Sequence, residues 1–314
     1  MNLSTKMMVG AVLKLVVRKA DTDEIVGETP EFHNLVLMTG LTRMGVGAWI
    51  DRCCVGTGNS TPVASQVALD SFLASTTTVA TGAADTGGIQ VTTAPYYWFG
   101  RRTWRFAVGV ATGNISEVGL GWGNTTLWNR ALVKDIEGNP TTITVLADEY
   151  LDVISEVRVY PSSSTSSINL VDKVGNVIST HEVKIMPYFL NVESKVTWAA
   201  EKIAFGASSD SLRASNNDMP LTPGGLPASA VVGPGISMTY AGLSMHGAVV
   251  VSSSQLNFPQ RSFFTAIGGL MTLRPQWVER VCGFKWQFNP PIPKDAETIL
   301  TYKFTLTWGN YAPE

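Results

Sequence analysis

The chain has 314 residues, of which 45% are apolar and only 15% charged, and its 23 basic and 25 acidic residues give a net charge of −2. The length allows two domains that each bury a core, and a charged share below the roughly 25% of typical soluble domains is typical of a chain with extensive partner contacts. The near-neutral charge without a basic block argues against nucleic-acid binding, and no apolar run approaches the roughly 20 residues of a membrane-spanning helix, so no membrane insertion is expected.

The first predicted elements are β-strands. Residues 7–13 are an apolar run between two lysines, too short and without the cleavage pattern of a secretory signal, so synthesis and retention in the cytoplasm are expected. The stretch MNLSTKMMVGAVL, residues 1–13, is either an arm that docks on a neighbour or a first strand. Residues 13–37 alternate in polarity and predict a strand, a turn at residues 21–24, a second strand and a third extended run, before a short helical turn at 39–51.

The stretch RCCVGTGNSTPVA, residues 52–64, raises the possibility of a redox, metal or phosphate site. Neighbouring Cys53 and Cys54 rarely bond each other, a phosphate loop requires a lysine and a following helix, and the three histidines are scattered singly. We therefore expect reduced thiols, no metal and no cofactor. The stretch predicts a strand end in which one cysteine faces the core and Gly56 is the residue that the fold requires.

The run YYWFGRRTWRF, residues 96–106, is the sharpest surface candidate. Aromatic faces flanked by arginines stack on sugars or anchor a protein interface. The candidate interface or glycan contacts are Tyr96, Trp98, Arg101, Arg102 and Trp104. A second interpretation stays open, in which Tyr97, Phe99, Trp104 and Phe106 fill the core while the arginines face solvent.

Residues 141–160 alternate again and predict two half-buried strands after a turn at 137–140. They contain the densest acidic cluster, Asp148, Glu149 and Asp152, where a glycosidase would place its two carboxyl groups. Glu149 and Asp152 point to opposite faces of a strand, so a solvated turn is favoured. His33 has no nucleophile-elbow motif beside it and is interpreted as a polar residue at a strand end. The sequence thus predicts no catalytic residue and no enzyme.

The stretch PSSSTSS, residues 161–167, is small and polar and predicts a linker between two domains. Four stretches before it are matched in the same order by four after it, with Gly56 and Gly206 offset by 206 − 56 = 150 positions. We therefore predict two related antiparallel β-sandwich domains, residues 1–160 and 168–314. Each contains a short helix, at 39–51 and 193–203, and a long loop, at 65–95 and 207–236.

Several stretches together resemble the tail structural proteins of tailed bacteriophages. They are EFHNLVLMTGLTRMG (31–45), CCVGTGNSTP (53–62), RFAVGVATGNISEVGLGW (105–122), LWNRALVKDIEGNPTTITVLADEYLDV (127–153) and WQFNPPIPKDAETILTYKFTLTW (286–308). The resemblance covers both halves and carries over no functional residue. It implies a non-enzymatic virion component in the tail, whose partners are other tail proteins and further copies of the chain.

Three-fold assembly is usual for fibre-like components, so a trimer is the expected homo-oligomer. The chain has neither heptads nor a collagen-like repeat to drive it, which favours a baseplate, collar or fibre-attachment component over a fibre shaft. The alternative is a receptor- or glycan-binding module that attaches to a host surface polysaccharide or protein.

Overall fold

Strands make up nearly all regular structure of the computed structural model, which describes residues 1–189, 196–198, 200–205, 211–268, 271–273 and 282–312. Within these ranges one helix forms, α1 (Met38–Met44). The all-β fold class predicted from the sequence is confirmed.

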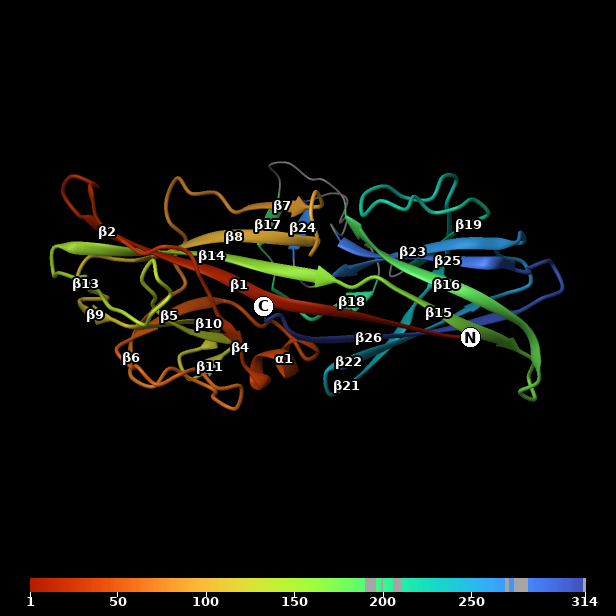
Figure 1. Ribbon diagram of the computed structural model, residues 1–314, viewed down its shortest axis with the longest axis horizontal. Helices are drawn as coiled ribbons and strands as arrows, with labels where there is room; N and C mark the ends of the chain where they lie inside the picture. Colours follow the sequence, from red (N-terminus) through yellow and green to blue (C-terminus); the bar gives the residue numbers. More distant parts are fainter. Residues whose placement is uncertain (190–195, 199, 206–210, 269–270, 274–281, 313–314) are drawn as a thin grey trace.

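The largest sheet runs along the long axis of the molecule (Figure 1). Its strands, in spatial order, are β21 (Ser237–Ala241), β22 (Ser244–Val251), β26 (Leu300–Asn310), β1 (Asn2–Lys19), β14 (Glu149–Pro161), β8 (Tyr97–Phe106) and β7 (Thr86–Gln90), with β2 (Ile25–Glu28) and β3 (Phe32–His33) also beside β1. The turn predicted at residues 21–24 lies between β1 and β2.

Strand β1 belongs to both halves of this sheet. Its later residues pair antiparallel with β14, from Met7 opposite Pro161 to Lys19 opposite Glu149. Its earlier residues pair parallel with β26, from Asn2 opposite Lys303 to Val9 opposite Asn310. The odd-numbered residues from 3 to 17 are all buried, so a single face of β1 borders the core along the whole strand.

Two further sheets pack with this one. The first is formed by β4 (Leu35–Val36), β12 (Asn129–Leu132), β10 (Glu117–Gly123), β5 (Arg52–Gly56) and β6 (Phe72–Thr76), with β11 (Thr126–Leu127) beside β10. The second is formed by β15 (Ser164–Val171), β16 (Val177–Phe189), β25 (Cys282–Ile292), β23 (Gln260–Gly268), β19 (Ser211–Ser215) and β20 (Val231–Gly235), with β18 (Ala204–Phe205) beside β23. The remaining pairs are β9 (Gly113–Ile115) with β13 (Ile143–Val145) and β17 (Val196–Trp198) with β24 (Met271–Leu273).

One hydrophobic core extends through both halves. The second sheet packs its rings on β26, with Trp286 5.5 Å from Phe304 and Phe263 4.7 Å from Tyr302 between ring centroids. At the junction with the first half, Trp308 Nε1 on β26 donates to the Leu41 carbonyl of α1 at 2.8 Å. These ring contacts lie within the C-terminal half, and the two halves share an interior because β1, α1 and β26 all contribute to the same core cluster.

Three predictions about segments change in the structure. Residues 164–167 of the predicted linker are strand, because they pair with β16 from Ser164 opposite Ile185 onward. Residues 196–198 of the predicted second helix are strand β17, and no helix is found in the described part of that segment. The predicted long loops at 65–95 and 207–236 contain strands β6 and β7, and β19 and β20. Gly206 lies outside the described residues, and the duplication of two sandwich domains stays a prediction.

Candidate functional site

Strand β8 divides the residues of the 96–106 cluster between two faces of the sheet. Trp98 and Trp104 turn toward the core, with 1% and 0% of their surface exposed. Their register partners on β14, Val159 and Val153, are also buried. Because alternate residues of a strand share a face, the predicted surface contact is corrected for both tryptophans: they are core residues.

Arg102 also lies on the inward side. Its guanidinium donates to both carboxylate oxygens of Asp85, at 2.8 and 2.6 Å, and its side chain is 17% exposed. It also lies over the rings of Trp104 and Trp198, 5.1 and 5.2 Å from their centroids. Both ring contacts and the ion pair hold Arg102 in a fixed packing position.

The other two candidates lie nearer the surface. Tyr96 is half-buried and packs on the edge of the core, whereas the Arg101 side chain is 45% exposed. The alternative interpretation, that Tyr97, Phe99, Trp104 and Phe106 fill the core, is confirmed for Trp104 and Phe106. It is wrong for Tyr97 and Phe99, which are half-buried on the opposite, outer face because odd-numbered residues of β8 point away from the core.

The outer face carries a cluster of rings that we call the aromatic surface, formed by Tyr97, Phe99, Tyr160 and Tyr311. Tyr160 stacks on Tyr311 with 3.8 Å between centroids and lies 5.2 Å from Tyr97, which in turn lies 6.3 Å from Phe99. The Arg158 guanidinium covers Tyr97 at 4.6 Å. Burial raises the pKa of the Tyr160 hydroxyl to about 12. The sequence cluster missed Tyr160 and Tyr311, because only strand pairing places β14 beside β8 and brings Tyr311, just after β26, across β1 onto Tyr160.

Ion pairs follow the aromatic surface along the same face. Arg101 donates twice to Glu156 Oε2, at 3.0 and 2.6 Å, and Arg105 binds both oxygens of Asp152 at 2.7 Å. The Asp152 carboxylate raises the pKa of Arg105. Each pair joins residues that lie opposite each other on β8 and β14, so the charges are matched across the strands.

The acidic cluster does not form a carboxylate pair for hydrolysis. Asp148 is exposed and binds Lys19 at 3.2 Å, while Glu149 is buried and accepts from the Leu146 backbone N–H at 2.8 Å. Asp152 is held by Arg105, as described above. His33 ends β3, where burial and the charges of Arg158 and Lys134 lower its pKa. Lys19 Nζ also lies 3.3 Å from Glu149 Oε1 and so bridges Asp148 and Glu149, and each of these acidic groups is engaged in a local structural contact.

Both cysteines of residues 52–64 are free and fully buried. Cys53 belongs to the main core, and Cys54 packs in a small second cluster with Leu37, Leu69 and Leu127. The prediction that one of the two cysteines faces the core is confirmed by Cys53. Cys54 is buried as well, on the opposite side of β5. Burial raises the pKa of Cys54 to about 12 and that of Cys53 well above its usual value.

Gly56 is required because a carboxylate passes directly beside it. A Cβ at this position would lie 2.4 Å from the Ser71 carbonyl oxygen and 2.6 Å from Glu117 Oε1. Glu117 accepts from the backbone N–H groups of Gly58 and Ser71 at 2.9 and 2.8 Å. Its other oxygen accepts from Arg130 Nε at 2.8 Å. This buried network holds the loop after β5 in place, so its chemistry is structural.

Apolar side chains are exposed at the tip of the β15–β16 hairpin and at Ile299, the residue just before β26. We call this surface the hairpin end and define it by Val171 (42% exposed), Val174 (83%), Val177 (57%), Ile178 (61%) and Ile299 (62%). Figure 1 shows the hairpin projecting at the end of the molecule that is distant from β2. Val171 and Ile299 border the same hollow, whereas the consecutive Val177 and Ile178 project from opposite faces of β16. Large apolar side chains exposed together at one end of a molecule are typical of a contact site.

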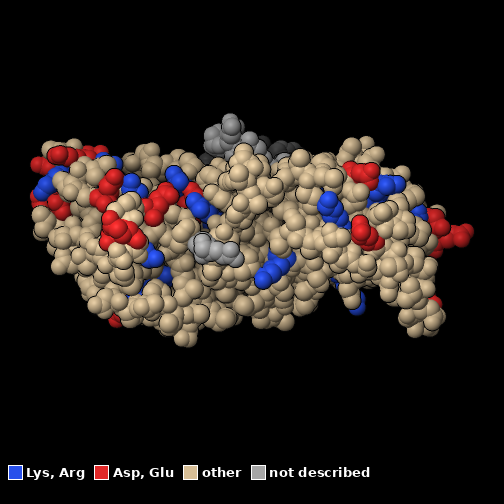
Figure 2. All heavy atoms as spheres, viewed as in Figure 1, with Lys and Arg blue, Asp and Glu red and all other residues tan. Residues whose placement is uncertain are grey.

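The charged side chains lie mostly toward the two ends of the visible face. Figure 2 shows acidic and basic groups crowded at the end that contains β2 and the start of β14, fewer toward the opposite end, and few over the middle of the molecule. A surface with few charges loses little hydration when a neighbouring subunit covers it.

No family model, curated protein or solved structure matches the chain. Over the described ranges, no three His, Cys, Asp or Glu residues gather to hold a metal ion. In that same part of the chain, no helix is long and apolar enough to cross a membrane.

Proposed function

We propose that the protein is a non-enzymatic structural component of a bacteriophage tail, at the baseplate, collar or fibre attachment, and acts through subunit interfaces. The hairpin end carries this proposal, because five large apolar side chains there are between 42% and 83% exposed on and beside an edge strand. Burying them against other tail proteins or further copies of the chain, as in a trimer, would remove that surface from water. The resemblance of residues 31–153 and of the C-terminal stretch to tail proteins supports the same role.

The test has two parts. Electron microscopy and cross-linking of purified phage particles measure the position, copy number and neighbours of the chain, and absence from the particle would refute the proposal. In solution, Ile178→Asp at the hairpin end should abolish association with the neighbours so identified. Ile136→Asp is the matched control, since Ile136 is 80% exposed in a turn away from this surface. Equal association by both variants would remove the hairpin end from the interface.

A second function, binding of a host surface polysaccharide, is favoured by the aromatic surface. Tyr97 and Phe99 are half-buried on this face, and the Arg158 guanidinium lies over the Tyr97 ring, so aromatic and cationic groups of the kind that contact sugars lie together. Further along the same face a hollow of ≈ 380 Å³ is bordered by Arg18, Thr103, Arg105 and Asp152. These polar groups supply hydrogen bonds of the kind that orient a sugar.

Polysaccharide binding measured by isothermal titration calorimetry separates the two functions. Tyr97→Ala with Phe99→Ala should weaken the binding, while Ile89→Ala, outside the aromatic surface, serves as a folded control. Binding that survives the loss of both rings would exclude this surface as the glycan site. A tail position with no outward-facing surface would exclude host attachment altogether.

A further inference from the structure

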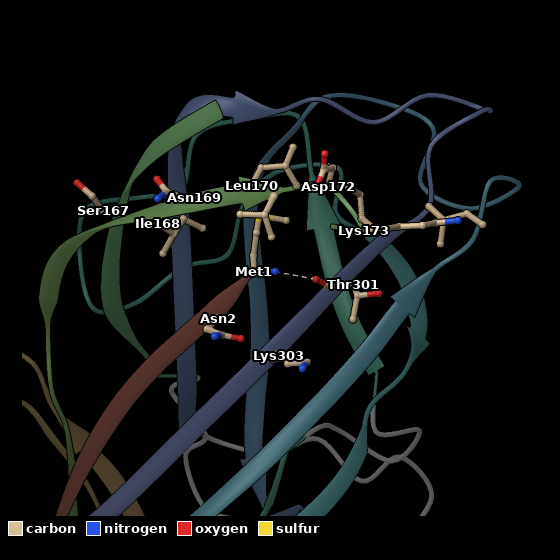
Figure 3. Close-up of a pocket in the computed structure, with 13 residues that line it drawn as sticks. Met1, Asn2, Ser167, Ile168, Asn169, Leu170, Asp172, Lys173, Thr301 and Lys303 are labelled. Carbon is tan, nitrogen blue, oxygen red and sulfur yellow. Dashed lines mark hydrogen bonds between the residues drawn. The ribbon is translucent and has the colours of Figure 1, made fainter. Parts of the chain in front are cut away.

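A hollow of ≈ 690 Å³ lies between the largest sheet, which contains β1 and β26, and the sheet that contains β15 and β16. It is bordered by the start of β1, by β15 with the turn after it, and by the start of β26. Figure 3 shows Met1 and Thr301 at its centre, with the Met1 amino group donating to the Thr301 carbonyl at 3.1 Å, and Lys173 and Lys303 on its borders. The volume falls within the roughly 300–1,000 Å³ of ligand pockets.

Two open strand edges border this hollow. In the described structure β15 pairs only with β16, so its other edge is free from Ser164 to Val171. Strand β1 pairs with β26 on one side from Asn2, whereas its pairing with β14 begins only at Met7. An open edge presents unpaired N–H and C=O groups, which an extended segment of another chain can satisfy by joining the sheet.

The hollow carries unpaired positive charge. Neither the Lys173 nor the Lys303 ammonium contacts a carboxylate among the described residues, although both side chains are exposed at its border. One acid, Asp172, also borders the hollow, but it accepts from the backbone N–H groups of Val174 and Asn176 at 2.9 and 2.8 Å and is held in its own turn. The Lys303 charge also lowers the pKa of the Met1 amino group, after the larger effect of burial.

Apolar side chains complete the lining. Val171 and Ile299, which belong to the hairpin end, lie 42% and 62% exposed beside the two lysines. Ile168 and Leu170 project from β15 itself. A strand that occupies the hollow would therefore meet apolar contacts from these residues and positive charge from Lys173 and Lys303, in addition to a free backbone edge.

We propose that this hollow receives an extended, acidic segment of a neighbouring polypeptide, which adds to the open edge of β15 as a further strand. Carboxylates of the segment bind the ammonium groups of Lys173 and Lys303, and its apolar side chains cover Val171 and Ile299. The inference rests on the proposed assembly role, because it names the chemistry of the partner that covers the hairpin end. An eight-residue strand at about 3.3 Å per residue matches the eight residues of β15.

The test measures binding of the full chain to a fluorescein-labelled eight-residue peptide. In this peptide Thr alternates with Val, and two of the Thr positions carry Glu instead. Fluorescence anisotropy should show binding that weakens at high salt. A peptide with glutamine in place of glutamate should bind about tenfold more weakly. A peptide methylated on alternate backbone nitrogens should not bind, because it cannot donate to the strand edge.

Protein variants locate the site. Lys173→Gln with Lys303→Gln should weaken binding by about tenfold, while Lys184→Gln, an exposed lysine on β16 outside the hollow, should leave it unchanged. Circular dichroism checks that each variant is folded. Equal binding of the methylated peptide, or of the lysine double variant, would overturn the inference. So would lysine-dependent binding of a sulfated oligosaccharide with no peptide binding, which would assign the hollow to an anionic glycan.

The two proposals fail separately. If the chain is found on the particle but no peptide binds, only the strand-addition inference is lost. If the chain is absent from the particle while the peptide binds as expected, the tail function is lost and the edge site remains.

Discussion

Glu117 and Arg130 form an ion pair in which neither side chain is exposed to solvent, with 2.8 Å between Glu117 Oε2 and Arg130 Nε. Arg130 also donates to Asp70 Oδ2 at 2.8 Å and to Gln66 Oε1 at 3.0 Å. The network thus joins β10 and β12 to the loop between β5 and β6. Its groups are hydrogen-bonded throughout, which is the condition under which a buried charge is tolerated.

Removing one partner should strongly destabilise the fold. Arg130→Met leaves the Glu117 carboxylate buried without its cation, and we expect the free energy of unfolding to fall by about 3–5 kcal/mol. Urea denaturation followed by tryptophan fluorescence measures the change. The control is Arg261→Gln, which breaks the exposed 3.2 Å pair with Asp218 and should cost less than about 1 kcal/mol. Similar losses in both variants would show that burial does not distinguish the pairs.

Gly56→Ala should destabilise the protein because its new methyl group would overlap Glu117 Oε1 and the Ser71 carbonyl. Overpacking of this kind costs about 1–3 kcal/mol, and more where backbone must move. Gly224→Ala is the matched control, since no atom lies within 4 Å of a Cβ built there. Thermal unfolding that is equally shifted in the two variants would contradict the role assigned to Gly56.

The three thiols should be inert in the folded protein. Burial raises the pKa of Cys54 and of Cys282 to about 12, and that of Cys53 well above its ordinary value. Thiolate is the reactive form, so alkylation by iodoacetamide should be slow in buffer and rapid in denaturant. Mass spectrometry counts the modified cysteines. Fast, equal modification of Cys53 and Cys54 in the native protein would contradict their burial.

Lys285 should make stability depend on pH. Its side chain is buried, donates to the carbonyls of Pro220 and Thr222 at 2.8 and 2.7 Å, and has a pKa lowered by burial from 10.5 to about 8. At pH values between about 8 and 10.5, Lys285 is protonated in the unfolded chain but has released its proton in the folded chain. The free energy of unfolding should therefore rise with pH over this range. Below the lower value both states are charged and this increase is absent.

The comparison with Lys285→Met isolates this contribution, because the other titrating groups are common to both proteins. Urea unfolding at about pH 7.5 and about pH 9.5 should show a steeper rise for the unmodified protein than for the variant. Parallel changes in the two proteins would show that Lys285 titrates alike in its folded and unfolded states.

Trp104→Ala should cost far more stability than Tyr97→Ala. Trp104 is fully buried and donates from Nε1 to Ser155 Oγ at 2.9 Å, so its truncation leaves a cavity and should cost about 3–5 kcal/mol. Tyr97 is half-buried on the outer face and leaves no enclosed space. Chemical denaturation of both variants measures the contrast, and comparable losses would contradict the division of β8 into two faces.

The sequence by itself determined the class of local structure. Alternating polarity predicted the strands of residues 13–37 and 141–160, because a strand with one buried face requires a period of two. The stretch around Cys53 was predicted as a strand end, and β5 confirms it. The glycine at position 56 was singled out as well, although its cause, the approach of Glu117, comes from a strand about sixty positions later and was invisible locally.

Only the tertiary structure decided which surfaces are exposed and which segments join. Alternation gives two faces to β8 but does not say which one borders the core, so Trp98 and Trp104 looked as accessible as Tyr97. The polar composition of residues 161–167 indicated a linker, yet pairing with β16 makes residues 164–167 strand. The parallel pairing of β1 with β26 joins positions 303 − 2 = 301 residues apart, and such long-range contacts depend on the packing of the whole chain rather than on any local pattern.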